Sequence, residues 1–241
     1  MLARSIVALG AAVLLWPAVA GPGGQAYGQD TRPGIAVFPF DNGGSYGQEK
    51  DNFDALQKGI AGLMISDLAA NAAVRVVERD QLQKLLDEQN LGAAGAGGPG
   101  RVDPQTAAKI GKLVGARYVV TGVFVDFYGD FRLDARLINV ETSEIVKVES
   151  DRMQRDHLFD LIRAVAAKLM RDVNLPALPK RASEQPMNRQ VPTEALTYYS
   201  RALLYHDRGQ KAKAVEMYEK ALQVFPDFAE ASDGLKREKT S

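Results

Sequence analysis

The chain has 241 residues, with 30 basic and 30 acidic side chains and therefore no formal net charge. This balance excludes the basic footprint that nucleic acids or anionic membranes attract, so we expect its partners to be proteins. The chain contains no cysteine, which excludes disulfide bonds, thiol nucleophiles and a thioether-linked lipid. An ordinary hydrophobic core must hold the fold.

The N-terminal residues have the pattern of a secretory signal peptide. Arg4 precedes an apolar run over residues 6–15, and small residues at 18–21 form an A-x-A cleavage pattern. We expect residues 1–28 to be the signal peptide, with cleavage after residue 20 or after residue 28. A membrane anchor is the alternative, but the run is about half of the ~20 apolar residues that cross a bilayer. We therefore expect a periplasmic protein that is associated with the outer membrane only through its partners.

The segment 31–175 alternates between the periods of strands and helices, beginning with a continuous apolar run that predicts a strand buried on both faces. Further along, Asp103 and Pro104 combine a capping carboxylate with a proline at the first helical position, and Gly115 is a typical helix stop. These signals predict a helix between them. The elements expected before this helix are a strand at 34–40, a helix at 51–70, a strand at 74–77 and a helix around 80–89.

The second half of this segment predicts a meander of strands and a closing helix. Phe131 and Leu133 alternate with Arg132 and Asp134, so this strand should have one buried and one wet face. Strands followed and preceded by helices predict a mixed α/β sheet with helices packed on it. The elements expected here are strands at 118–125, 131–137 and 145–149 and an amphipathic helix at 155–173.

These motifs together resemble CsgG-type proteins, the curli secretion component family and its periplasmic relatives, which share a core fold with the TolB N-terminal domain. The resemblance covers most of residues 34–172, and its motifs are structural rather than catalytic. It implies a CsgG/TolB-like α/β fold, a place in the bacterial envelope and protein partners. The motifs are IAVFPF at 35–40, VVERDQLQKLLDEQ at 76–89, AAKIGKLVGARYVVTG at 107–122 and RLINVETSEIV at 136–146.

The chain departs from the channel-forming members of that family. Those members are lipid-anchored rings whose subunits each contribute two β-hairpins to a membrane barrel, whereas this chain has no anchor cysteine. Each hairpin would need two strands of ~9–11 residues, yet only residues 128–130 connect Phe127 to Phe131. The second candidate position, 147–156, is short and highly charged. We therefore expect the soluble core of the family and not its pore.

A linker and a helical repeat are predicted after residue 175. Residues 176–192 contain four prolines among polar side chains, which favours a linker. Residues 193–241 resemble a single tetratricopeptide repeat with a polar tail, although Arg201 stands where a leucine is usual. A generic helical hairpin is the alternative. Alanines allow close helix packing and Tyr198, Tyr205 and Tyr218 fill the space between the helices, and we expect these three tyrosines to bind protein partners.

Enzymatic interpretations have little support in the sequence. Residues 95–100 match G-x-G-x-x-G, but the dinucleotide fingerprint must follow a strand and open a helix, and this run follows a helix and contains Pro99. Neither His157 nor His206 has a second histidine nearby for a metal site. No G-x-S-x-G elbow is present. We expect no catalytic residues, no metal and no cofactor.

The sequence thus favours a non-enzymatic, exported adaptor or scaffold protein of the cell envelope, working in a secretion or outer-membrane assembly system. One alternative is a ring-forming periplasmic subunit of a curli-like export complex, which would be a homo-oligomer. A hydrolase of unrecognised type is a lower-ranked alternative.

Overall fold

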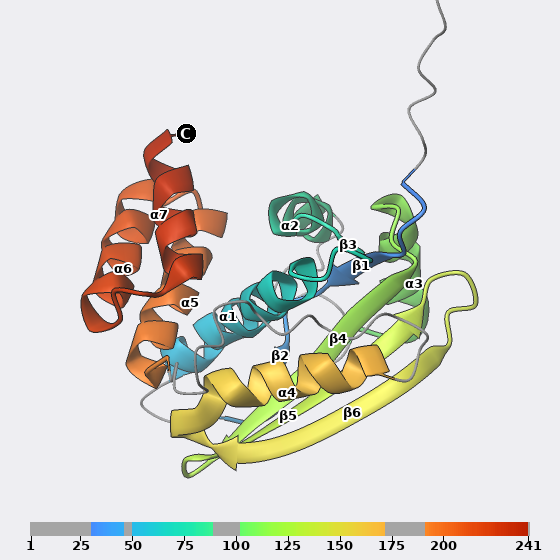
Figure 1. The fold of residues 1–241 in the computed structure, drawn as a ribbon, viewed down its shortest axis with the longest axis horizontal. Helices are drawn as coiled ribbons and strands as arrows, with labels where there is room; N and C mark the ends of the chain where they lie inside the picture. Colours follow the sequence, from blue (N-terminus) through green and yellow to red (C-terminus); the bar gives the residue numbers. More distant parts are fainter. Residues whose placement is uncertain (1–29, 46–49, 89–101, 172–190, 241) are drawn as a thin grey trace, which may run out of the picture. The chain divides into compact units, whose positions relative to one another are not determined.

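The computed structural model describes residues 30–45, 50–88, 102–171 and 191–240. Its fold is a mixed α/β sheet with packed helices, followed by three C-terminal helices (Figure 1), so the predicted fold class is confirmed. The strands are β1 (Gly34–Val37), β2 (Asp41–Asn42), β3 (Arg75–Val76), β4 (Tyr118–Phe127), β5 (Asp130–Asn139) and β6 (Ile145–Gln154). The helices are α1 (Lys50–Ala69), α2 (Arg79–Glu88), α3 (Pro104–Leu113), the short 3-10 helix η1 (Arg155–His157), α4 (Leu158–Arg171), α5 (Thr193–Asp207), α6 (Lys211–Val224) and α7 (Ala229–Thr240).

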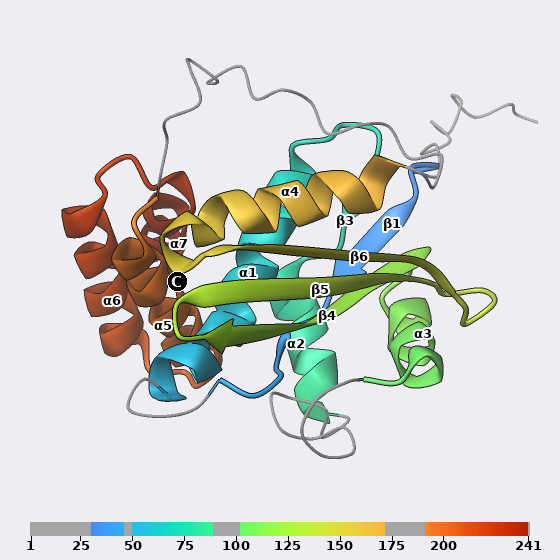
Figure 2. The ribbon, with the colours of Figure 1, turned by 90° about the horizontal axis from the view of Figure 1, so that it is seen from below.

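The sheet has the order β3-β1-β4-β5-β6, with β2 paired to β4 beside this path. The pairs among β1, β2, β3 and β4 are parallel, and the long strands β4, β5 and β6 form an antiparallel meander, which Figure 2 shows side by side. The register of β5 and β6 shifts between Leu137 and Ile138, where a bulge interrupts the ladder. The two edge strands of this order differ in length, because β3 has two residues and β6 has ten.

Successive side chains of β1 and of the residue that follows it point alternately into two different hydrophobic cores. Ile35 and Val37 of β1 belong to the larger core, which also contains side chains of α1 and α4. Ala36 and Phe38 belong to a smaller core with side chains of α2 and α3. Because all four residues are at most 1% exposed, the predicted burial of this strand on both faces is confirmed.

The predicted helix cap at Asp103 and the predicted short turn between β4 and β5 are both present in the structure. The Asp103 carboxylate accepts hydrogen bonds from the backbone N–H groups of Gln105 and Thr106, each at 3.0 Å, and so caps α3. The connection between β4 and β5 is as short as expected, because Phe127 pairs directly with Asp130. Tyr128 and Gly129 form the turn with positive φ angles of 54° and 90°.

The three C-terminal helices share the larger core with α1 and α4. Residues Arg32–Ser241 consequently form one compact unit that contains both the α/β part and the helical repeat. Most of the linker predicted at 176–192 lies outside the described residues. The predicted polar tail contains a helix, α7, whose buried residues Ala231, Gly234 and Glu238 lie on one face at helical spacing.

Candidate functional site

Helix α5 packs closely on α1 at two glycines. A Cβ atom added to Gly59 would lie 1.8 Å from the Oγ atom of Ser200, and one added to Gly62 would lie 2.7 Å from the hydroxyl of Tyr199. Ser200 and Tyr199 are both buried. The apolar face of the repeat's first helix is therefore covered by this chain's own α1, and α1 supplies glycines where the two helices approach each other.

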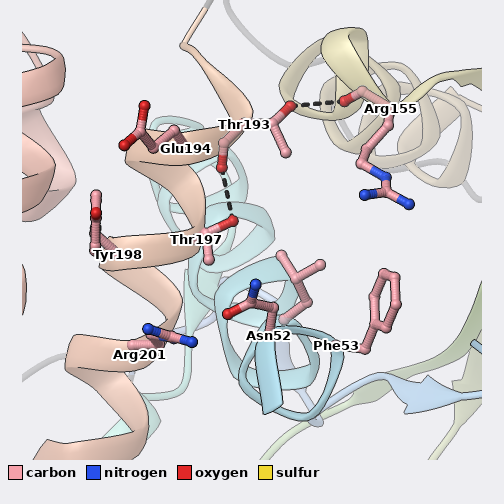
Figure 3. Close-up of a pocket in the computed structure, with 9 residues that line it drawn as sticks. Asn52, Phe53, Arg155, Thr193, Glu194, Thr197, Tyr198 and Arg201 are labelled. Carbon is pink, nitrogen blue, oxygen red and sulfur yellow. Dashed lines mark hydrogen bonds between the residues drawn. The ribbon is translucent and has the colours of Figure 1, made fainter. Parts of the chain in front are cut away.

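A cleft of about 310 Å³ opens where the N-terminal ends of α1 and α5 meet η1 (Figure 3). Thr193 anchors α5 at this place by donating a hydrogen bond to the backbone carbonyl of Arg155 at 2.8 Å. The Arg155 guanidinium lies 5.4 Å from the centre of the Phe53 ring and forms an ion pair with Asp126. The residues that line the cleft are Asn52, Phe53, Leu56, Arg155, Thr193, Glu194, Thr197, Tyr198 and Arg201.

Two polar side chains of the cleft have the chemistry to recognise a ligand. The Oδ1 atom of Asn52 is buried, and no described residue donates a hydrogen bond to it. An unsatisfied buried acceptor costs about 1–3 kcal/mol, which a ligand's N–H group could recover. Arg201, the position at which the repeat departs from its usual leucine, also lines the cleft and could bind a carboxylate.

A buried ion cluster fastens the other end of α5 to α1 and α2. Asp207 forms an ion pair with Lys58 of α1 at 2.5 Å and accepts a hydrogen bond from Arg79 of α2 at 2.7 Å. The side chains of Lys58 and Asp207 are only 4% and 7% exposed, and Lys58 also donates to Gln83 at 2.8 Å. Because the charges are paired and hydrogen-bonded, removing one partner would leave an uncompensated charge in the interior.

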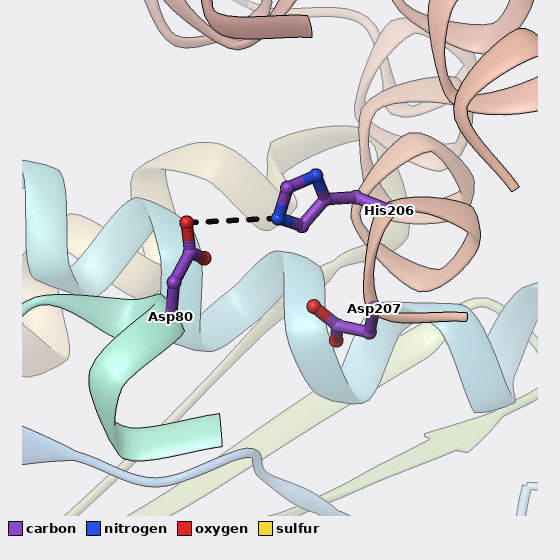
Figure 4. A group of neighbouring side chains, drawn as sticks. All are labelled: Asp80, His206 and Asp207. Carbon is purple, nitrogen blue, oxygen red and sulfur yellow. Dashed lines mark ion pairs between the residues drawn. The ribbon is translucent and has the colours of Figure 1, made fainter. Parts of the chain in front are cut away.

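His206 connects the same region to α7. Its Nε2 atom lies 3.6 Å from Asp80 of α2 (Figure 4), and its Nδ1 atom contacts the Glu238 carboxylate of α7. Asp80, followed by Glu238, raises the pKa of His206 above its ordinary value, although partial burial acts in the opposite direction. Protonated His206 therefore holds carboxylates from two other helices.

One group of ligand atoms in the described part of the chain meets the distance requirement for a metal site. Atoms of Asp80, His206 and Asp207 lie within 4.8 Å of one another. However, Lys58 and Arg79 already neutralise Asp207, and both ring nitrogens of His206 face carboxylates. A divalent cation would have to displace these cations, so we interpret the group as an ion-pair cluster that joins helices.

The three tyrosines predicted to bind partners occupy different environments. Tyr198 lines the cleft, and Lys220 lies 6.0 Å from the centre of its ring. Tyr205 is half-buried on α5 with Lys213 5.4 Å from its ring centre. Tyr218 is only 2% exposed, and burial raises its pKa to about 12. Gly234 of α7 covers it so closely that an added Cβ atom would lie 2.4 Å from the ring. Partner binding by these tyrosines stays a prediction.

Sequence reasoning missed Tyr199, which contacts α1. The spacing of Leu196, Tyr199 and Leu203 at three and four residues was the available signal, because these residues form one stripe of a helix. The Nδ1 atom of the other histidine, His157 of η1, lies 3.6 Å from the Asp160 carboxylate of α4. The G-x-G-x-x-G run at 95–100 and the predicted signal peptide at 1–28 lie outside the described residues.

None of the described helices combines the length and the apolar composition that a membrane span requires.

Similar folds occur among solved structures. The LpoB C-terminal domain from Salmonella enterica is 22% identical, with 54% of this chain and 88% of that chain covered and a TM-score of 0.34. TolB from Acinetobacter baumannii is 16% identical over 58% of this chain and 27% of that chain, with a TM-score of 0.35. The PelC dodecamer from Paraburkholderia phytofirmans is 17% identical over 58% of this chain and 85% of that chain, with a TM-score of 0.31. No curated protein matches the chain.

Two family models match the sequence. Residues 195–228 match the tetratricopeptide repeat, which agrees with the repeat predicted over α5 and α6. Residues 24–132 match the family described as "Curli production assembly/transport component CsgG". The chain thus contains one segment that matches the CsgG family model and one that matches the tetratricopeptide repeat, and both resemblances were predicted from its motifs.

Proposed function

We propose that this protein is a non-enzymatic adaptor of the bacterial cell envelope that is exported to the periplasm and binds protein partners of a secretion or outer-membrane assembly system. The match to a family described as an assembly and transport component supports the proposed place in a secretion or assembly system. The tetratricopeptide repeat supports protein binding, because repeats of this class commonly present helical surfaces to peptides and proteins.

The observation that carries the proposal is the cleft between α1, η1 and α5. The usual apolar face of α5 is covered by α1, as the contacts at Gly59 and Gly62 show, so a partner must bind elsewhere on the repeat. The cleft presents a buried amide oxygen from Asn52 and a cation from Arg201 beside apolar side chains. This combination of an acceptor, a cation and apolar side chains suits an extended peptide segment. The backbone N–H groups of such a segment need acceptors, and its side chains need charged or apolar contacts.

The expected partner segment follows from these groups. A backbone N–H group would donate to Asn52, a carboxylate would bind Arg201, and an apolar side chain would contact Phe53 and Leu56. Tyr198 would form an aromatic wall of the cleft, as tyrosine often does at the centre of an interface.

A substitution at the unusual repeat position tests the proposal. Arg201→Leu restores the residue that is usual in the repeat, so the variant should fold while losing the cation of the cleft. We expect it to capture its envelope partners at least tenfold less well than the unmodified protein, a change of about 1.4 kcal/mol. Arg208→Leu, at an exposed position beyond the same helix, is the matched control. Equal capture by the unmodified protein and the Arg201→Leu variant, with both folded, would refute binding through the cleft.

A further inference from the structure

Strand β6 leaves a long free edge on the sheet. Among the described residues it pairs only with β5, and its ten residues contrast with the two residues of β3 at the opposite end. Figure 1 shows β6 as the outermost strand on its side. A long edge strand presents unpaired backbone N–H and C=O groups that can form hydrogen bonds with another strand.

The exposed apolar side chains of the described residues are concentrated on this edge. Ile145, Val146 and Val148 are 40%, 40% and 58% exposed, and they make up half of the large apolar side chains with this degree of exposure. They lie together in the first half of β6. Such side chains favour the addition of a strand here, because the new strand would cover them.

The two sides of β6 carry different side chains. Val148 pairs with Arg136 of β5 on the face away from α4, whereas Lys147 and Glu149 pair with Leu137 and Ala135 on the other face. Lys147 and Glu149 form an ion pair at 3.0 Å within the strand. In a continuous antiparallel sheet, residues that lie opposite each other point to the same face, so only certain registers can be formed.

We propose that β6 pairs with β6 of a second copy of this chain, antiparallel and with a two-fold axis at Val148. In this register Lys147 of each copy lies opposite Glu149 of the other, and the two Val148 side chains meet at the axis. Opposite charges across a strand pair stabilise it, and like charges oppose it. The pairing is isologous, so it closes as a dimer and does not lead to a ring.

The two-fold axis could instead lie at a neighbouring residue of β6, because opposite residues would still point to the same face of the sheet. These alternative registers are less favourable. An axis at Lys147 or at Glu149 places that residue opposite its own copy, with a like-charge contact. An axis at Ser150 places Glu149 opposite Asp151, again with like charges. Among these registers, the axis at Val148 alone matches opposite charges and creates no like-charge pair.

The strength of the dimer follows from its size. One added strand pair buries less than the ~1,200 Å² at the lower end of stable protein interfaces. We therefore expect a weak dimer, whose measured mass rises with concentration from that of one chain to that of two.

Charge reversal tests the register directly. Lys147→Glu places two glutamates opposite each other at both contacts of the dimer, and Glu149→Lys places two lysines there. Each variant alone should be monomeric by sedimentation equilibrium at concentrations where the unmodified protein dimerises. An equimolar mixture should recover the dimer, because every contact then joins a glutamate to a lysine.

The mixture separates self-pairing from an effect within one chain. Both variants lose the ion pair within β6, and mixing cannot restore that pair. Gln154→Lys, outside the paired segment 145–151, is the control and should dimerise like the unmodified protein. A monomeric unmodified protein, a ring mass, or a mixture that stays monomeric would overturn the proposal. Unchanged circular dichroism spectra of the variants would show that folding is not the cause.

Discussion

The contact between α1 and α5 predicts a specific coupling between Gly59 and Ser200. In Gly59→Ala the new methyl group would lie 1.8 Å from the Ser200 Oγ atom and 2.8 Å from its Cβ atom. Alanine favours a helix interior by about 1 kcal/mol relative to glycine, but overpacking a core costs about 1–3 kcal/mol. The single substitution should therefore range from neutral to a loss of about 2 kcal/mol in the free energy of unfolding.

Ser200→Gly removes both colliding atoms, so Gly59→Ala should become stabilising by about 1 kcal/mol in that background. The two backgrounds should differ by about 1–3 kcal/mol, which a double-mutant cycle reports as coupling. Urea unfolding of the four proteins, followed by circular dichroism, measures it. If Gly59→Ala changes the free energy of unfolding equally in both backgrounds, the helices do not approach each other as described.

Three further predictions concern charge and processing. Asp207→Ala leaves the buried Lys58 without its carboxylate, while Arg79 keeps its ion pair with Asp80. It should lower the free energy of unfolding by about 3–5 kcal/mol in urea, and a loss below about 1 kcal/mol would contradict the burial of Lys58. Asp80 and Glu238 raise the pKa of His206 in the folded protein. The ion pairs of His206 therefore stabilise the fold fully at a pH below about 6.5, the pKa of histidine in the unfolded chain, and this stabilisation is lost as the pH rises through the pKa of His206 in the folded protein. His206→Gln should flatten that fall in urea titrations, and an equally steep fall in the variant would assign it to another group. Trp16 is the only tryptophan, so periplasmic protein should show tyrosine emission alone, and tryptophan emission would contradict signal cleavage.

Much of the α/β fold could be predicted because its signals are local. The apolar run at β1, the cap at Asp103 and the short turn at Gly129 each depend on a few neighbouring residues. The second half of β6 was harder to predict, because its residues lack an apolar alternation. The reason is that Asp151, on the face toward α4, pairs with Lys168 at 2.7 Å instead of entering the core.

The candidate site depends on contacts that the sequence does not reveal. The repeat pattern identified α5 and α6, but it gave no sign that Gly59 would receive Ser200. Likewise, His206 meets Asp80 and Glu238 only after three separate helices have packed together. Arg201 departs from the repeat pattern in the sequence, but its place in the cleft depends on how α5 packs against α1 and η1.

Site-specific crosslinking in living cells tests the adaptor function most directly. A photoreactive aromatic residue at Tyr198 lies in the cleft, and the same residue at the exposed Lys112 of α3, which does not line the cleft, is the matched control. We predict that the cleft position forms covalent adducts with one or a few envelope proteins, that Arg201→Leu abolishes these adducts, and that the control position does not form them. No adduct from the cleft, or the same adducts from both positions, would contradict partner binding at this site.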